Sequence, residues 1–581
     1  MPPAPLAAYR PQLDPVADSL AWSALVATLP LLVLFLLLGV LRLRAQWAGL
    51  GALACAIVVA VAAYGMPVSQ AALAATEGAA FGLFPIMWIV VNAIWIYTMT
   101  VATGHFTTLR RSVSSISPDL RIQAMIIAFC FGGLLEALAG FGTPVAITAV
   151  MLIGLGFRPM KAAVVTLVAN TAPVAFGALA TPIITLSNIT ALPLQELSAV
   201  VGRQTPVLAC FVPLVLVYIV DGRRGLRQTW LPAVVVGVAF AVGQFAAANY
   251  MSVQLTDIVA AFAGTGAAVL LLRYWSPAMV LTGERAAQEA PEEPAPAAPS
   301  GRGSAAAPST GTGPAGGTDA GTPAGPAVPA DDGPLRRGDV LLAYAPYAVI
   351  IAVFSIAQFG PLRDLLAATT VVVPWPGLDV LSLSGEPATA ATFRFDWLAS
   401  GGTLLLLAGL VSAAILRLRP AAVLRAYADT LRQLAAPIVT VAAVLALAYV
   451  MNLSGQTITI GHWIAGAGTL FAFFSPILGW IGVAVTGSDT SANALFGTLQ
   501  VAAADNIGLD PVLMAAANSS GGVLGKMISP QNLAIAAAAT GLAGREGDLF
   551  RRVFGWGLVM LLGMCVLVYL QSTGVLGWML P

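Results

Sequence analysis

Long apolar runs separated by short polar segments dominate the chain. A helix needs roughly 20 apolar residues to cross the hydrocarbon core of a membrane. We expect membrane helices at 20–41, 47–64, 79–101, 122–139, 206–220, 230–247, 258–272, 340–356, 397–415, 435–451, 463–485 and 553–569. Adding the interrupted apolar stretches, the pattern predicts an all-α polytopic membrane protein with roughly 12–14 membrane helices.

The composition agrees with a membrane protein. Of 581 residues, 58% are hydrophobic and 9% are charged, whereas about a quarter of the residues of a soluble protein are charged. The formal net charge of +1 leaves no basic face for a nucleic acid. These values exclude a soluble enzyme, a disordered protein and a nucleic-acid-binding protein. The four cysteines are far apart and there are two histidines, so we expect no metal and no other cofactor.

One segment breaks the apolar pattern. Residues 284–332 consist almost entirely of Ala, Pro, Gly, Thr and Ser, a composition that cannot bury a core. We therefore interpret 284–337 as a disordered linker. It separates an N-terminal membrane half, residues 1–283, from a C-terminal half, residues 338–581.

Arginine positions predict the orientation of the spans. The clusters that follow the spans, near Arg42, Arg110, Arg223 and Arg552, can all lie in the cytoplasm, as the positive-inside rule requires. This orientation places the linker in the cytoplasm and both chain termini outside it. It also places the loop 359–396 outside, where the β-branched stretch after residue 368 can form a short cap. We expect Glu77 at the membrane interface.

Each half contains a polar stretch that interrupts an apolar run. These stretches are 136–182 and 486–532. Gly140 pairs with Gly487 and Asn170 with Asn518, because the Gly-to-Asn spacing is 30 residues in the first half and 31 in the second. A proline follows each Asn by 12 residues. The matched order and spacing predict two inverted repeats with broken or re-entrant helices.

Such breaks have a physical meaning inside a membrane. Lipid cannot satisfy the freed backbone groups, so breaks are tolerated where they line a cavity or are buried, and in secondary transporters they mark the binding site. Half-helix N-termini also favour anions. Alternatively, the small residues only allow close helix packing. The substrate-binding residues that we expect are Gly140, Gly142, Thr143, Asn170, Thr171, Ser488, Thr490, Ser491, Asn518, Ser519, Lys526, Ser529 and Gln531.

Glu136, Asp489 and Lys526 stand out among the ionisable residues of these stretches, because charges inside an apolar run are expensive and indicate function. Glu136 can bind and release a proton if it is removed from water, or it can bond to backbone N–H groups of the break. Asp489 either caps a helix or belongs to the site. Lys526, one of two lysines, can pair with a substrate carboxylate, with Glu136 or with Asp489, or extend to the membrane boundary. We expect Glu136 or Asp489 to carry a proton.

Four motifs are long enough to carry a resemblance. They are Leu135-Glu-Ala-Leu-Ala-Gly-Phe-Gly-Thr-Pro144, Val168-Ala-Asn-Thr-Ala-Pro173, Gly487-Ser-Asp-Thr-Ser-Ala-Asn493 and Gly521-Gly-Val-Leu-Gly-Lys-Met-Ile-Ser-Pro-Gln531. Together with Gly202-Arg-Gln-Thr-Pro206, they resemble the bacterial L-lactate permease family over nearly the whole chain except the linker and the N-terminal tail. The long linker is not typical of that family.

The resemblance implies an inner-membrane carrier of L-lactate and related 2-hydroxymonocarboxylates such as glycolate, coupled to protons. It also implies inverted repeats with re-entrant hairpins. The partners would be a small organic anion, H⁺ and the lipid bilayer, and the oligomeric state stays open. The main alternative is a sodium- or proton-coupled carrier of another organic anion such as a dicarboxylate. A dicarboxylate needs a second cation, and the polar stretches offer only Lys526 plainly.

Two other classes fit less well. A membrane-embedded enzyme would need a recognisable catalytic pair, and we find none; a Walker A motif is also absent, so ATP does not drive the protein. A channel would lack saturable, slow turnover.

Overall fold

The computed structural model describes residues 8–41, 43–138, 140, 142–282, 336–357, 359–383, 385–388, 391–543 and 545–581. The expected linker, 284–337, therefore lies outside the described residues except for its last two positions. The described residues are mostly helical, with one two-stranded antiparallel sheet.

The first membrane half runs from α1 to α13. Its helices are α1 (Leu20–Ala27), α2 (Leu29–Phe35), α3 (Ala45–Ala62), α4 (Val68–Phe81), α5 (Trp88–Ala102), α6 (His105–Ser114), α7 (Leu120–Gln123), α8 (Gly132–Leu138), α9 (Thr143–Gly154), α10 (Pro159–Ala169), α11 (Gly177–Thr190), α12 (Leu194–Tyr250) and α13 (Thr256–Leu272). Three π-helical segments, η1 (Leu36–Val40), η2 (Gly82–Met87) and η3 (Ala124–Phe131), join neighbouring helices. Short 3₁₀ turns are η4 (Val174–Phe176) and η5 (Val253–Leu255).

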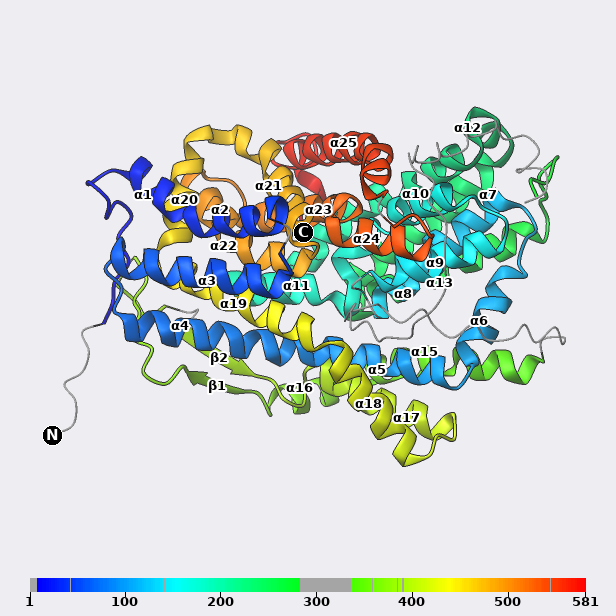
Figure 1. Ribbon diagram of the computed structural model, residues 1–581, viewed down its shortest axis with the longest axis horizontal. Helices are drawn as coiled ribbons and strands as arrows, with labels where there is room; N and C mark the ends of the chain where they lie inside the picture. The colour runs from blue at the N-terminus through cyan, green and yellow to red at the C-terminus, as the bar shows by residue number, and fades with distance from the viewer. Residues whose placement is uncertain are drawn as a thin grey trace, which may run out of the picture.

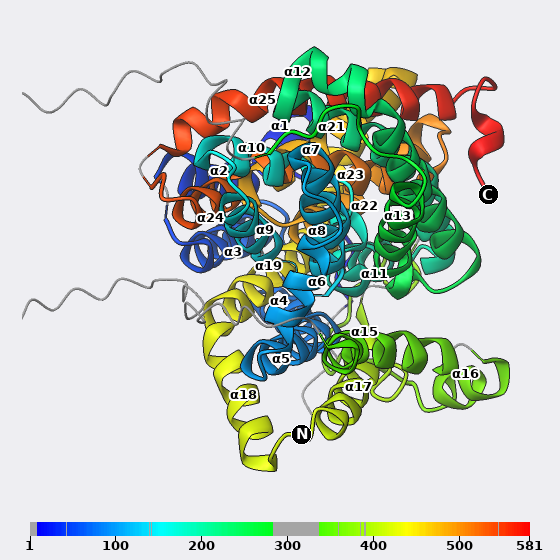
Figure 2. The ribbon, with the colours of Figure 1, turned by 90° about the vertical axis from the view of Figure 1, so that its right-hand side faces the viewer.

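The second half runs from α15 to α25. Its elements are α15 (Arg337–Ala357), α16 (Gly360–Ala367), β1 (Val371–Pro374), β2 (Thr392–Phe395), α17 (Gly401–Ile415), α18 (Pro420–Gln433), α19 (Ala435–Ser454), α20 (Gln456–Ile464), η7 (Ala465–Leu470), α21 (Phe471–Thr486), α22 (Asp489–Ile507), α23 (Pro511–Gly525), η8 (Lys526–Ile528), α24 (Pro530–Ala539), α25 (Glu546–Gln571) and η9 (Gly577–Met579). Figure 2 shows α5, α15, α17 and α18 beside the helices that hold the two polar stretches.

Ten of the described helices are long and apolar enough to cross a membrane, or eleven if α10 and α11, which are bent by 66°, form one span. This count treats α12 as one helix. However, Asp221, Gly222 and Thr229 leave the helical conformation, so that α12 folds back on itself. Ser198 Oγ then donates to Ala248 O at 2.9 Å. The prediction of a polytopic helical membrane protein is confirmed.

Segments that we expect outside the cell meet at one end of the molecule. Tyr9 Oη donates to Tyr64 O and Ser454 O, both at 3.0 Å, and Tyr9 N donates to Asp379 O at 3.0 Å. The strands β1 and β2 form the small sheet in the same loop, where Val371 pairs with Phe395. Figure 1 shows α1, α20 and the start of α4 together at the left. We call this the Tyr9 end.

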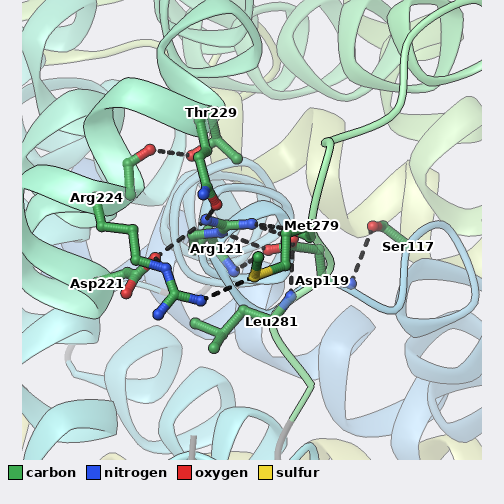
Figure 3. Close-up of polar contacts among 10 residues, drawn as sticks. Ser117, Asp119, Arg121, Asp221, Arg224, Thr229, Met279 and Leu281 are labelled. Carbon is green, nitrogen blue, oxygen red and sulfur yellow. Dashed lines mark hydrogen bonds and ion pairs between the residues drawn. The ribbon is translucent and has the colours of Figure 1, made fainter. Parts of the chain in front are cut away.

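A buried charge network holds the opposite end together (Figure 3). The side chain of Arg121 is fully buried. It donates to both oxygens of Asp119 (3.0 and 2.7 Å), to Asp221 (3.0 Å), to Gln228 (2.6 Å) and to the carbonyl of Met279 (2.6 Å). The network therefore ties the start of α7 to the turn within α12 and to the segment after α13. We call this the Arg121 end.

Candidate functional site

The first polar stretch forms a helical hairpin. The helix of η3 and α8 ends at Leu138, and α9 runs back beside it, so that a Cβ at Gly132 would lie 3.5 Å from Thr148. At the tip, Gly140 and Gly142 have φ of +54° and +80°. Only glycine adopts such values without strain, so these glycines specify where the chain turns.

The second polar stretch forms a similar hairpin. The helix α21 ends at Thr486 and is followed by Gly487, which has a φ of +75°. Ser488 caps α22 by accepting a hydrogen bond from Ser491 N at 3.3 Å. A Cβ at Gly482 would lie 2.7 Å from the ring of Phe496, so α22 runs back along α21.

The helix that follows each hairpin is also broken. After α10, residues 178–180 have positive φ, and α11 continues from Thr181. After α23, η8 leads to Ser529, which caps α24 by accepting from Asn532 N. The two prolines that we paired therefore both begin a helix after a break. The two asparagines differ, because Asn170 ends α10 whereas Asn518 lies within α23.

Both hairpin tips lie against the first turns of α24. A Cβ at Gly142 would lie 3.2 Å from Asn532 Oδ1 and would overlap Ile535. A Cβ at Gly487 would lie 2.5 Å from Gln531 Oε1. The two polar stretches, far apart in the sequence, thus meet at one place.

An ion pair joins the two halves at this place. Lys526 Nζ contacts Glu136 Oε1 at 2.5 Å, and the other oxygen of Glu136 accepts from Asn170 Nδ2 at 3.0 Å. The side chains of Lys526 and Glu136 are 8% and 2% exposed. Of the two side-chain partners that the sequence left open for Lys526, Glu136 is the one that it contacts. Among the described residues, Glu136 is the one hydrogen-bond acceptor of an ammonium that has three donors.

Asp489 lies in an amide and hydroxyl network beside this ion pair. Its Oδ2 accepts from Ser519 Oγ at 2.6 Å and from Asn493 Nδ2 at 3.4 Å. Asn493 also donates to Pro182 O at 3.1 Å and accepts from Asn518 at 2.9 Å. Asp489 Oδ1 has no hydrogen-bond partner among the described residues. This network connects α22 and α23 to α11 of the first half.

The predicted site residues differ in exposure. Thr143, Ser488 and Thr490 are partly exposed and Gln531 is exposed. The buried ones are Glu136, Gly140, Gly142, Asn170, Thr171, Asp489, Ser491, Asn518, Ser519, Lys526 and Ser529. The hydroxyls of Thr171 and Ser529 donate to nearby backbone carbonyls at 2.7 and 3.0 Å, so they stabilise the breaks locally.

Sequence reasoning missed several polar residues around the site. Asn493, Gln500 and Asn532 are buried, and Gln500 Nε2 donates to Asn518 at 3.2 Å. Asp257, at the start of α13, is fully buried. An acid that begins an apolar run with no arginine near it in sequence is the signal that could have identified Asp257.

The placement of Glu77 at the membrane interface is wrong. Its side chain is 1% exposed, and neither carboxylate oxygen has a hydrogen-bond partner among the described residues. The reason is that the helical segment Val68–Ala102 begins well before the apolar run that we recognised, so Glu77 lies inside it.

The described residues contain no group of three or more His, Cys, Asp and Glu side chains that could hold a metal ion. The chemistry of the site is therefore that of one ammonium, two carboxylates, amides, hydroxyls and helix termini. Such groups bind and release a small anion and can move a proton.

Comparison with known proteins identifies the family. The family model described as L-lactate permease matches residues 23–574. The L-lactate permease of Bacillus subtilis (strain 168) is 40% identical, with 98% of this chain and 99% of that protein covered. The L-lactate permease of Escherichia coli (strain K12) is 38% identical, with 99% and 100% covered. The glycolate permease GlcA of the same strain is 40% identical, with 96% and 97% covered.

A solved structure also matches over most of the chain. The YdaH transporter of Alcanivorax borkumensis is 16% identical, covers 87% of this chain and 88% of its own, and aligns with a TM-score of 0.44. The sequence relatives, which are permeases and span the chain end to end, settle the family. The chain is a multi-pass membrane protein that belongs to the L-lactate permease family.

Proposed function

We propose that the protein is a secondary active transporter of the plasma membrane that takes up L-lactate and related 2-hydroxymonocarboxylates such as glycolate together with protons. The names of its full-length relatives, L-lactate permease and glycolate permease, support the substrate class. The positive-inside distribution of arginines supports a cytoplasmic 284–337 linker and termini outside the cell.

The observation that carries the proton coupling is the buried pair of Lys526 and Glu136. A buried charge needs a partner of opposite sign, and one ammonium can neutralise one anion. When the carboxylate of lactate forms an ion pair with Lys526 in place of Glu136, Glu136 becomes an unpaired buried anion unless it binds a proton. Binding lactate and a proton together keeps the site neutral, whereas binding lactate alone does not.

The substrate lies, in this proposal, against the two hairpin tips. The helix N-termini of α9 and α24 supply N–H groups for the carboxylate, and the partly exposed hydroxyls of Thr143, Ser488 and Thr490 are available to the 2-hydroxyl group. Asn170 is positioned by Glu136, and its side-chain oxygen Oδ1 has no hydrogen-bond partner among the described residues. The remaining buried residues of our list hold this arrangement in place.

The two hairpins would be inverted repeats. Lys161, at the start of α10, donates to Val220 O at 2.7 Å, which places the base of the first hairpin at the Arg121 end. A Cβ at Gly461 of α20 would lie 2.8 Å from Ala502 of α22, and Thr459 donates to Leu13 O, which places the base of the second hairpin at the Tyr9 end. The two hairpins therefore enter the molecule from opposite ends. This arrangement suits a carrier that alternates access to one central site.

The test uses the purified full-length protein in liposomes. With an inward proton gradient, labelled lactate should accumulate, and an uncoupler should abolish the accumulation. Uptake that is insensitive to the uncoupler would refute proton coupling. An excess of unlabelled glycolate should compete with lactate, whereas equal or stronger competition by succinate would favour a dicarboxylate carrier.

Two substitutions of an acid by its amide then identify the residue that carries the proton. For Glu136→Gln we expect labelled lactate to exchange across the membrane while net proton-driven uptake is lost, because the amide cannot change charge. Asp489→Asn, which keeps acceptors for Ser519, is the matched comparison. If Asp489→Asn shows this separation and Glu136→Gln does not, Asp489 carries the proton.

A further inference from the structure

A second buried acid adjoins the Glu136 site and belongs to neither hairpin. Asp257, in the first turn of α13, is 0% exposed. Its Oδ1 accepts one hydrogen bond, from Gln244 Nε2 at 2.9 Å, and its Oδ2 has no partner among the described residues. No arginine or lysine forms an ion pair with it in the described part of the chain.

Helix packing brings Asp257 to the level of Glu136. A Cβ at Gly264 of α13 would lie 3.0 Å from Cys130 Sγ, so the two helices are in contact there. Glu136 follows Cys130 by six residues, and Asp257 precedes Gly264 by seven residues. The two helices are antiparallel, so nearly equal numbers of residues from this contact bring the two acids together.

One side chain connects Asp257 to the break that holds the site. Gln244 Nε2 donates both to Asp257 and, at 3.2 Å, to the carbonyl of Ala172, directly after Asn170 and Thr171. Thr205 Oγ1 donates to the carbonyl oxygen of Gln244 at 3.3 Å and fixes its orientation. Gln244 is fully buried, so this connection excludes water.

The charged groups around Asp257 leave no counterion for it. On α8, which packs against α13, Glu136 lies at the level of Asp257, and the charge of Glu136 is already matched by Lys526. From α12, Arg203 bonds instead to Asn249 and to Met579 O. The segments η5 and α11 contain no ionisable side chain, and η3 offers the thiol of Cys130.

We propose that Asp257 holds a proton in this conformation and transfers it to Glu136 when the substrate carboxylate forms an ion pair with Lys526. A buried carboxylate with a single neutral donor costs several kcal/mol, whereas a carboxylic acid carries no charge to desolvate. On transfer, the proton leaves the carboxyl group of Asp257 for the carboxylate of Glu136, and Asp257 is left ionised. It regains a proton from the nearby surface at Tyr250 and Met251, whose side chains are 74% and 52% exposed.

This assignment rests on the proposed proton-coupled function and adds a residue to it. In this proposal Asp257 does not touch the substrate, because its hydrogen bond joins it to Gln244 and not to a hairpin tip. Its loss should therefore affect net proton movement and leave substrate binding intact. A residue with a merely structural role would lower exchange and proton movement together.

The experiment follows protons and lactate in the same liposomes. A trapped pH-sensitive dye reports acidification of the lumen when an inward lactate gradient is imposed, and labelled lactate reports exchange. For Asp257→Asn we expect loss of acidification with exchange preserved, and for Asp257→Glu we expect acidification to return. Asp510→Asn is the matched control, because Asp510 is an acid that only caps α23; both readouts should equal those of the wild type.

The outcomes separate this proposal from the proposed function. If the wild-type protein exchanges lactate but does not acidify the lumen, proton coupling itself is wrong. If the wild type acidifies the lumen and Asp257→Asn does so equally well, Asp257 is not the proton donor. Should Asp257→Asn fail to fold, Asp257→Ser provides the same test. Parallel loss of exchange and acidification in a folded variant would also overturn the proposal.

Discussion

Two buried cations in this protein, Arg121 and Lys526, differ in how many of their hydrogen-bond donors have a partner. The guanidinium of Arg121 makes five hydrogen bonds, to two carboxylates, an amide and a carbonyl. Within the described part of the chain, the ammonium of Lys526 makes one hydrogen bond, to Glu136. A charge with all its donors satisfied has nothing to gain by moving. A charge with spare donors can exchange its partner for an anion of similar chemistry, which is what a carrier needs and what an anchor must avoid.

Breaking the anchor should give the largest free-energy effect. Among the described residues, Arg121→Ala leaves the buried Asp119 without a cation and leaves Asp221 with Arg224 alone, at 4.0 Å, so we expect about 3–5 kcal/mol of lost stability. The thermal midpoint in detergent should fall sharply, while lactate exchange per folded molecule stays close to that of the wild type. Arg121→Lys, which keeps the charge but not the planar donors, should fall between. An unchanged midpoint would show that the network does not anchor this end.

Removing the exchangeable cation, Lys526, should weaken substrate binding. With Lys526→Ala we expect lactate binding to weaken by about 30-fold or more, because truncating one member of a buried charge pair costs about 2–5 kcal/mol and about 1.4 kcal/mol is a tenfold change in affinity. Isothermal titration calorimetry on the detergent-solubilised protein measures this directly.

Because Lys526→Ala also leaves Glu136 unpaired, a double variant separates folding from binding. Lys526→Met combined with Glu136→Gln carries no buried charge at this position, so it should fold and still bind no lactate. Normal lactate binding by this double variant would contradict the role of Lys526 as the partner of the substrate.

The same contrast between crowded and open positions exists at two glycines. Gly142 and Gly104 have similar φ, +80° and +74°. A side chain at Gly142 would meet Ile535 and Asn532, whereas a Cβ at Gly104 would meet no described residue within 4 Å beyond its chain neighbours. Both alanine variants bear a backbone strain of about 1–2 kcal/mol. We expect Gly142→Ala alone to reduce lactate exchange in liposomes. Equal effects of the two variants would mean that the contact between the hairpin tip and α24 is unimportant.

Two helix caps give the smallest difference. Ser529→Ala and Asp510→Ala each remove a cap, at about 1 kcal/mol, so their thermal midpoints should fall by similar amounts. Ser529 also donates to the carbonyl of Lys526, whereas Asp510 bonds only to its own helix. Only Ser529→Ala should raise the lactate KM. A raised KM in both would assign the effect to general loosening.

Much of the site could be predicted from local sequence. Glycines and prolines inside apolar runs locate the breaks, since the backbone conformations at Gly140, Gly142 and Gly487 are ones that glycine alone adopts freely. Glu136, Asp489 and Lys526 stood out because ionisable groups are rare in membrane spans. These signals need nothing beyond neighbouring residues in the chain.

Other features could not be predicted in this way. The partner of Lys526 lies 390 residues away in the sequence, and no local rule ranks Glu136 above Asp489. Asn493 and Asn532 lie in the second polar stretch, but neither was among the residues that we expected at the site. Glu77 was misplaced because the length of its helix depends on packing against α19, where a side chain at Gly78 would collide with Leu445.

The sequence by itself determined that this chain spans a membrane, that its two halves each carry a polar break, and that the chain resembles one family of permeases. Those properties follow from hydrophobicity, backbone conformational preference and local motifs, which act over a few residues. The tertiary structure alone decided which charges are saturated and which are exchangeable. That distinction depends on how many donors and acceptors distant segments bring to one buried atom, and only folding brings those segments together.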